Sequence, residues 1–99
     1  MAHGFVSVQF EPSPDITRAE LTTWWKSLPD SILRAKGTLP LRGEKSAFYY
    51  FQALAGNDDI HVEEMESNQW TKPLVVLIGH GITEEELQGF IPRESSVTK

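Results

Sequence analysis

The stretch "SILRAKGTLPL", residues 31–41, decides the fold, because its pattern predicts a strand near the middle of the chain. Successive side chains of a strand point to opposite faces of a sheet. One face would carry mainly small and apolar side chains, namely Leu33, Ala35, Gly37, Leu39 and Leu41. The other face would carry Ile32, Arg34, Lys36, Thr38 and Pro40. We therefore expect a half-buried strand whose Leu/Ala/Gly face packs against helices.

The two cations of this strand, Arg34 and Lys36, lie two residues apart and so point the same way. Two interpretations are open. They are the solvent side of the strand, since isolated surface charges are common and cost little. Alternatively, they form a patch that binds a partner, which requires another surface to lie against that face. The residues alone favour the first interpretation.

Two hexapeptides, "ITRAEL" at 16–21 and "ITEEEL" at 82–87, predict the starts of two helices. Each has a threonine followed three residues later by a glutamate, which is a capping box. The flanking isoleucine and leucine sit at the positions of a hydrophobic staple. We expect the first helix to run from Arg18 to about Leu28 and the second from Glu84 to about Phe90 or Ile91, because a proline follows each of them.

Alternating or apolar runs predict the other strands, at residues 5–10, 46–54, 60–66 and 73–79. The run "PLVVLIG" at 73–79 is apolar throughout, which is typical of an interior strand. The expected order is β-α-β-β-β-β-α. Consecutive strands without intervening helices favour antiparallel pairing. The predicted fold is therefore α+β, an antiparallel sheet of about four to five strands with two helices packed on one face.

The 99 residues correspond to one domain, which we place at residues 1–92, followed by a disordered tail at 93–99. The formal net charge is −5 and there is no basic block, which argues against nucleic acid as a partner. No apolar run is long enough to span a membrane, and the start lacks the pattern of a signal peptide. The absence of cysteine suits a cytoplasmic protein.

Residues with catalytic or metal-binding chemistry are sparse. The sequence has neither a GxxxxGK[ST] phosphate loop nor a GxSxG nucleophile turn, so no catalytic residue is assigned. His61 and Glu63 share one face of a predicted strand, and His80 follows a later strand. A zinc-like site needs three or four converging ligands. A metal site formed by His61, His80 and Glu63 is therefore an alternative that depends on the tertiary structure.

Six segments together resemble the C-terminal domain of the CobW-like P-loop GTPases, over nearly the whole chain. They are "HGF" at 3–5, "ILRAKG" at 32–37, "FYYFQ" at 48–52, Trp70, "PLVVLIG" at 73–79 and "ITEEEL" at 82–87. Each segment alone is a weak signal, and their combination is more specific. The resemblance suggests that the chain is an excised part of a longer protein, because in this family the segment follows a GTPase domain.

The resemblance implies a function in metal handling or cobalamin synthesis. In this family an N-terminal GTPase domain binds GTP and magnesium, and a cysteine motif there binds zinc, cobalt or another transition metal. This chain has neither the phosphate loop nor a cysteine, so no cofactor is expected in this domain.

The implied role is that of a non-catalytic accessory domain of a cytoplasmic metallochaperone, acting in protein–protein interaction. Its partner would be the N-terminal GTPase domain of the parent protein or a metalloprotein client. The face with Arg34 and Lys36 would be the docking site. The alternative is a small metal-binding or metal-delivery domain that uses His61, His80 and neighbouring glutamates.

Overall fold

The computed structural model describes residues 4–66, 72–92 and 95–98. Two residues named above, His3 and Trp70, lie outside these ranges. The described residues form β1 (Phe5–Glu11), α1 (Arg18–Lys26), β2 (Ile32–Leu39), β3 (Tyr49–Leu54), β4 (His61–Glu64), β5 (Leu74–His80), α2 (Glu84–Gln88) and β6 (Ser96–Thr98). The predicted order of elements is confirmed, with β6 in addition. Neither helix of these ranges is long and apolar enough to cross a membrane.

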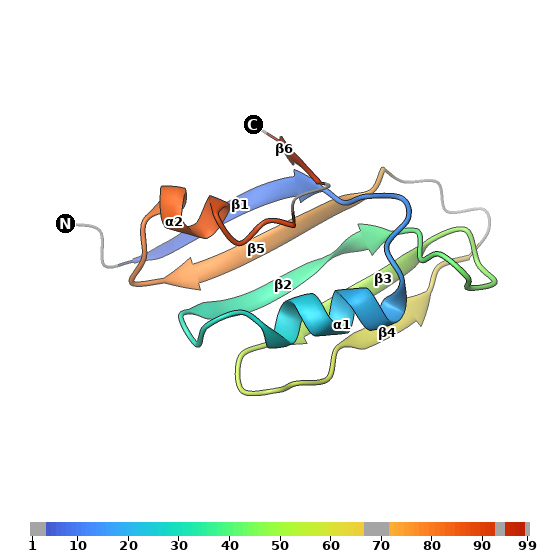
Figure 1. The fold of residues 1–99 in the computed structure, drawn as a ribbon, viewed down its shortest axis with the longest axis horizontal. Helices are drawn as coiled ribbons and strands as arrows, with labels where there is room; N and C mark the ends of the chain where they lie inside the picture. The colour runs from blue at the N-terminus through green and yellow to red at the C-terminus, as the bar shows by residue number, and fades with distance from the viewer. Residues whose placement is uncertain (1–3, 67–71, 93–94, 99) are drawn as a thin grey trace.

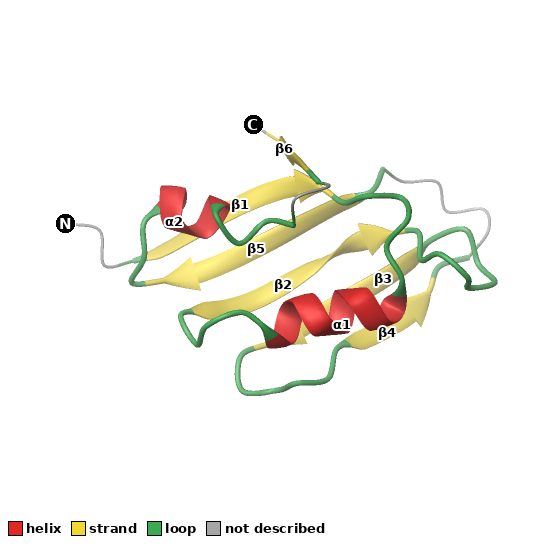
Figure 2. Ribbon diagram, in the orientation of Figure 1, coloured by secondary structure: helices red, strands yellow, loops and turns green. Residues whose placement is uncertain are grey.

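The strands form one sheet in the order β4-β3-β2-β5-β1-β6 (Figure 1). Every pair of neighbours is antiparallel. Strand β5 lies between β2 and β1, the interior position that its apolar run predicted. Both helices lie on the same side of the sheet (Figure 2). The prediction of an α+β fold with an antiparallel sheet and two helices is confirmed.

The C-terminal segment differs from its prediction. Residues 96–98 were expected to belong to a disordered tail, but they form β6 and pair with Glu11, Phe10 and Gln9 of β1. Without β6, this end of β1 would be an edge with unpaired backbone N–H and C=O groups. In the structure residues 96–98 thus form a strand where the sequence predicted a tail without regular structure.

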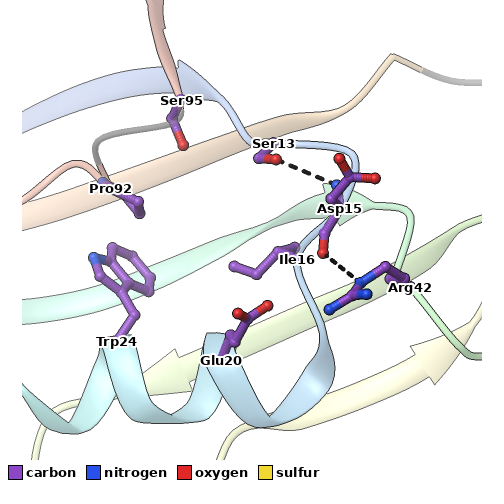
Figure 3. Close-up of a pocket in the computed structure, with 8 residues that line it drawn as sticks. All are labelled: Ser13, Asp15, Ile16, Glu20, Trp24, Arg42, Pro92 and Ser95. Atoms are coloured by element: carbon purple, nitrogen blue, oxygen red, sulfur yellow. Dashed lines mark hydrogen bonds between the residues drawn. The ribbon is translucent and has the colours of Figure 1, made fainter.

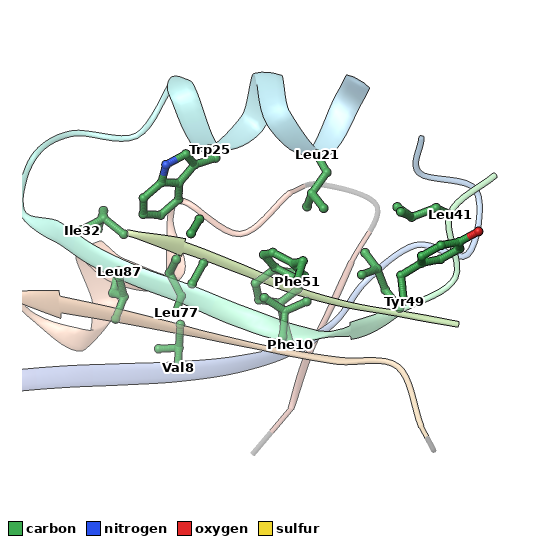
Figure 4. Packing of buried hydrophobic residues seen from close by; sticks show 14 residues of the cluster. Val8, Phe10, Leu21, Trp25, Ile32, Leu41, Tyr49, Phe51, Leu77 and Leu87 are labelled. Carbon is green, nitrogen blue, oxygen red and sulfur yellow. The ribbon is translucent and has the colours of Figure 1, made fainter. Parts of the chain in front are cut away.

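The hydrophobic core lies between the helices and the sheet (Figure 4). Phe10, Phe51 and Leu77 stand on the sheet side, Leu21 and Trp25 on α1. Each of these side chains is at most 6 % exposed. The Nε1–H of Trp25 donates to the backbone oxygen of Asn57 at 2.8 Å, so its polar atom is satisfied where the ring is buried.

Both helices begin with the predicted capping box. The backbone N–H of Glu20 donates to Oγ1 of Thr17 at 3.1 Å, and the N–H of Thr17 donates to Oε1 of Glu20 at 2.9 Å. Thr83 and Glu86 repeat this arrangement at 3.1 and 2.9 Å. The bonds from the backbone N–H and the hydroxyl of Thr17 lower the pKa of the Glu20 carboxyl.

The helices end earlier than predicted, at Lys26 and Gln88. Beyond these residues the hydrogen bonds tighten from i→i−4 to i→i−3. The N–H of Leu28 donates to the backbone oxygen of Trp25, and the N–H of Ile91 donates to the backbone oxygen of Gln88, both at 3.1 Å. Such tight turns satisfy helix-end carbonyls without extending the helix.

We expect the substitution Thr17→Ala to lower the free energy of unfolding by about 1 kcal/mol, because the first turn of α1 loses a side-chain acceptor. Urea unfolding of both proteins measures this loss. Thr23→Ala is the matched control, since Thr23 is exposed and lies inside the same helix. If both variants lose the same free energy of unfolding, the lost cap is not the cause of the destabilisation.

Strand β2 contains an irregularity that alternation alone did not predict. Its register with β5 shifts between Ile32 and Arg34, as in a β-bulge. Ile32 is consequently 1 % exposed and belongs to the core, whereas Leu33 lies outside the core cluster. The predicted faces are wrong for these two residues. From Arg34 onward they are confirmed, with Ala35 buried on the core side.

Candidate functional site

The face of the sheet opposite the helices is not covered by any described element (Figure 1). The strand registers define its members, because directly paired residues point to the same face. We call this surface the open face; its residues are Phe5, Ser7, Gln9, Arg34, Lys36, Thr38, Tyr50, Gln52, Leu54, His61, Glu63, Leu74, Val76, Ile78 and His80. The prediction that Arg34 and Lys36 share a face is correct.

The open face carries apolar side chains among its polar and charged ones. Phe5 is 71 % exposed and Leu54 is 44 % exposed, and these are the exposed large hydrophobic side chains among the described residues. Both belong to the open face. Between them β5 adds Val76 and Ile78, which are half-buried. Contiguous exposed apolar patches mark interaction sites in soluble proteins.

Arg34 is not a freely solvated cation. Its Nη2 donates to Oε1 of Gln52 at 3.3 Å, and the hydroxyl of Tyr50 donates to the same oxygen at 3.0 Å. The Nε atom of Arg34 is buried and has no hydrogen-bond partner among the described residues. An unsatisfied buried donor is uncommon in folded proteins. The bond to Gln52 thus holds the Arg34 side chain against Gln52 and Tyr50 on the open face.

A shallow groove of about 560 Å³ crosses one end of the open face. Its lining residues are Lys36, Gly37, Thr38, Tyr50, Lys72, Leu74 and Val76. The hydroxyl of Thr38 donates to the backbone oxygen of Lys72 at 3.0 Å, which holds Lys72 beside β2. Sequence reasoning missed Lys72, because only the pairing of β2 with β5 brings it near Lys36.

The candidate metal ligands do not converge. His61 and Glu63 are in side-chain contact on β4. His80 lies at the end of β5, and β3 and β2 separate it from β4. Three strand spacings amount to about 14 Å. The ring of His80 instead contacts Phe5, with centroids 4.9 Å apart. Among the described residues, no three His, Asp or Glu side chains are grouped so that they could hold a metal ion.

A second pocket, of about 530 Å³, lies on the helix side (Figure 3). Trp24, Ile16 and Pro92 line it together with Arg42 and Glu20. The Nε–H of Arg42 donates to the backbone oxygen of Asp15 at 3.0 Å, and the Nε1–H of Trp24 donates to that of Phe90 at 2.8 Å. These two polar groups therefore hold the walls of the pocket together.

The fold is similar to that of two solved structures. One is the Zn(II)-bound YjiA GTPase from E. coli, at 23% identity and a TM-score of 0.52. The other is a Zn(II)-bound triple mutant of YjiA GTPase, at 24% identity and a TM-score of 0.51. Each match covers 87% of this chain and 27% of the other. The chain thus spans about a quarter of the length of these neighbours, and at these identities the likeness concerns the fold.

No curated protein sequence matches this chain. The model of one protein family, described as the cobalamin synthesis protein cobW C-terminal domain, matches residues 5–91. The match includes both capping boxes and every strand from β1 to β5. The chain therefore belongs to the family of the cobalamin synthesis protein cobW C-terminal domain.

Proposed function

We propose that this domain is a non-catalytic accessory domain of a cytoplasmic, GTP-dependent metallochaperone or cobalamin-synthesis protein, and that it acts by protein–protein interaction through the open face. One observation carries the proposal. The exposed large apolar side chains, Phe5 and Leu54, both lie on the face that no described element covers. Such a face gains free energy when a second surface removes it from water.

The proposed partner is the GTPase domain of the parent protein. Membership of the family supports it. A further support comes from the YjiA GTPase. This chain covers 27% of the YjiA chain, so about three quarters of that chain lies outside the matched part. Interfaces between domains of one chain typically bury about 600–1,500 Å² and mix apolar with polar groups. The open face offers such a mixture, with Val76 and Ile78 beside Arg34 and Lys36.

No reaction is assigned to this domain. The sequence has no phosphate loop and no cysteine, and nucleotide chemistry is proposed to belong to the partner domain. A metalloprotein client is the other partner that the family relationship suggests. The test below distinguishes the two, because it uses the GTPase domain itself as the probe.

We expect this chain to bind a GTPase domain of the family, prepared without its own C-terminal domain, with a Kd that the variant Arg34→Glu/Lys36→Glu raises at least tenfold. Charge reversal at the centre of an interface leaves desolvated charges without partners. Isothermal titration calorimetry measures both affinities, with and without GTP. Lys45→Glu is the matched control, because Lys45 is exposed in the turn before β3.

Thermal unfolding of each variant must show first that the fold is retained. If Lys36→Glu alone is the better folded variant, it replaces the double variant. Binding that is equally tight in the wild type and in the charge-reversal variant would contradict docking through the open face. Binding of a metalloprotein client alone, with none to the GTPase domain, would contradict the choice of partner.

A further inference from the structure

The groove on the open face has a charge opposite to that of the whole chain. The chain has a formal net charge of −5. Lys36 and Lys72 line the groove, and none of its described lining residues is a carboxylate. Among the residues of the open face the carboxylate is Glu63, which lies on the edge strand β4, pairs with Tyr50 and contacts His61. Lys36 and Lys72 therefore make this end of the face cationic.

The floor of the groove is apolar. Leu74 and Val76 of β5 and Tyr50 of β3 line the groove together with the two lysines, and all three are half-buried. In an antiparallel sheet with one solvated face, strands alternate between apolar and polar residues. Strand β5 is apolar on both faces instead, as is typical of a strand that is covered on both sides. The floor is thus suited to contact with apolar side chains.

Arg34 extends this cationic end of the face by one row. It precedes Lys36 by two residues along β2 on the same face, and it pairs with Ile78 where Lys36 pairs with Val76. Its buried Nε–H has no acceptor among the described residues. A carboxylate accepts from guanidinium nitrogens in charge-assisted, often bidentate hydrogen bonds. An acidic side chain placed over this row would therefore meet the guanidinium of Arg34 as well as the ammonium of Lys36.

We infer that the groove binds an acidic amphipathic helix of the partner, with its apolar stripe on Leu74 and Val76 and flanking carboxylates on Lys36 and Lys72. A helix is the expected cover, because a sheet face buries its apolar residues against helices and both helices of this domain do so on the other side. The inference rests on the proposed function for the use of this face. It adds the charge and the shape of the partner surface.

The test uses two short synthetic helices that share one leucine stripe. The first has glutamate on both sides of the stripe, and the second has lysine at the same positions. Each is titrated into the isotope-labelled domain, and NMR records the amide shifts. The glutamate peptide is expected to shift the signals of Lys36, Thr38 and Val76, and high salt is expected to weaken its binding. The lysine peptide is expected to bind at least tenfold more weakly.

Charge reversal provides the second arm. In the variant Lys36→Glu/Lys72→Glu the preference is expected to invert, so that the lysine peptide binds more tightly than the glutamate peptide. Lys26→Glu/Lys45→Glu is the matched control, since both residues are exposed and lie off the open face. An inversion of preference cannot come from partial unfolding, which would weaken both peptides.

The outcomes separate this inference from the proposed function. If the GTPase domain binds the open face but reversal of Lys36 and Lys72 leaves its affinity unchanged, the inference is wrong and the proposed function stands. Equal binding of the two peptides also overturns the inference. If the glutamate peptide binds as expected and the GTPase domain does not bind, the acidic occupant is supported and the proposed identity of the partner is wrong.

Discussion

Replacement of Gly37 by alanine is expected to lower the free energy of unfolding by about 3 kcal/mol. A Cβ atom at this position would lie 2.2 Å from the carbonyl oxygen of Leu74 and 2.8 Å from Cα of Val75. Both are backbone atoms of β5, so no side-chain rotation can relieve the overlap. Strands β2 and β5 would have to separate at the centre of the sheet.

Urea unfolding followed by circular dichroism measures this loss. Gly4→Ala is the control, because a Cβ atom there meets nothing within 4 Å. If Gly37→Ala proves too unstable to purify, the amount of soluble protein relative to the control gives the same ranking. A Gly37→Ala domain as stable as the control would contradict the close approach of β2 and β5.

The second large effect is expected at Phe51. Its replacement by alanine should lower the free energy of unfolding by about 3–5 kcal/mol. Phe51 is 0 % exposed and lies at the centre of the core (Figure 4). It pairs directly with Gly37 on the neighbouring strand. Because glycine offers no side chain there, the ring of Phe51 has no bulky cross-strand neighbour on β2 that could fill the space it leaves.

Tyr50→Ala is the control for Phe51→Ala. Tyr50 is the preceding residue on the same strand, but it points to the open face and is only half-buried. Tyr50→Ala should lower the free energy of unfolding by well under half as much as Phe51→Ala does, since solvent already reaches the ring of Tyr50. Urea unfolding of both variants gives the comparison. Similar losses would contradict the assignment of the core to the helix side of the sheet.

Elements that depend on neighbours in sequence were predicted well. The capping boxes at Thr17 and Thr83 place each acceptor three residues from its donor, so local chemistry is sufficient to define both helix starts. The start of β3 was placed too early, at Ser46 rather than Tyr49. The N–H of Ser46 donates to the hydroxyl of Tyr49 at 2.8 Å, and alternation gives no sign of this bond.

Features that depend on strand order were not predictable from the sequence. Alternation placed Arg34 and Lys36 on one face correctly, because the two lie on one strand. It could not place Lys72 in the same groove as Lys36, or separate His61 from His80, since both relations follow from the order β4-β3-β2-β5. The bulge before Arg34 and the pairing of β6 likewise arise from contacts between distant segments.

We propose that partners bind the sheet on the side away from the helices. Methyl NMR with a soluble paramagnetic chelate tests it most directly, in the domain alone and in its complex with the GTPase domain. The methyl groups of Leu54, Val76 and Ile78 are expected to become shielded from the chelate on binding, while those of Leu28 and Ile91 on the helix side are not. Shielding of Leu28 and Ile91, with the sheet methyl groups as accessible as before, would contradict it.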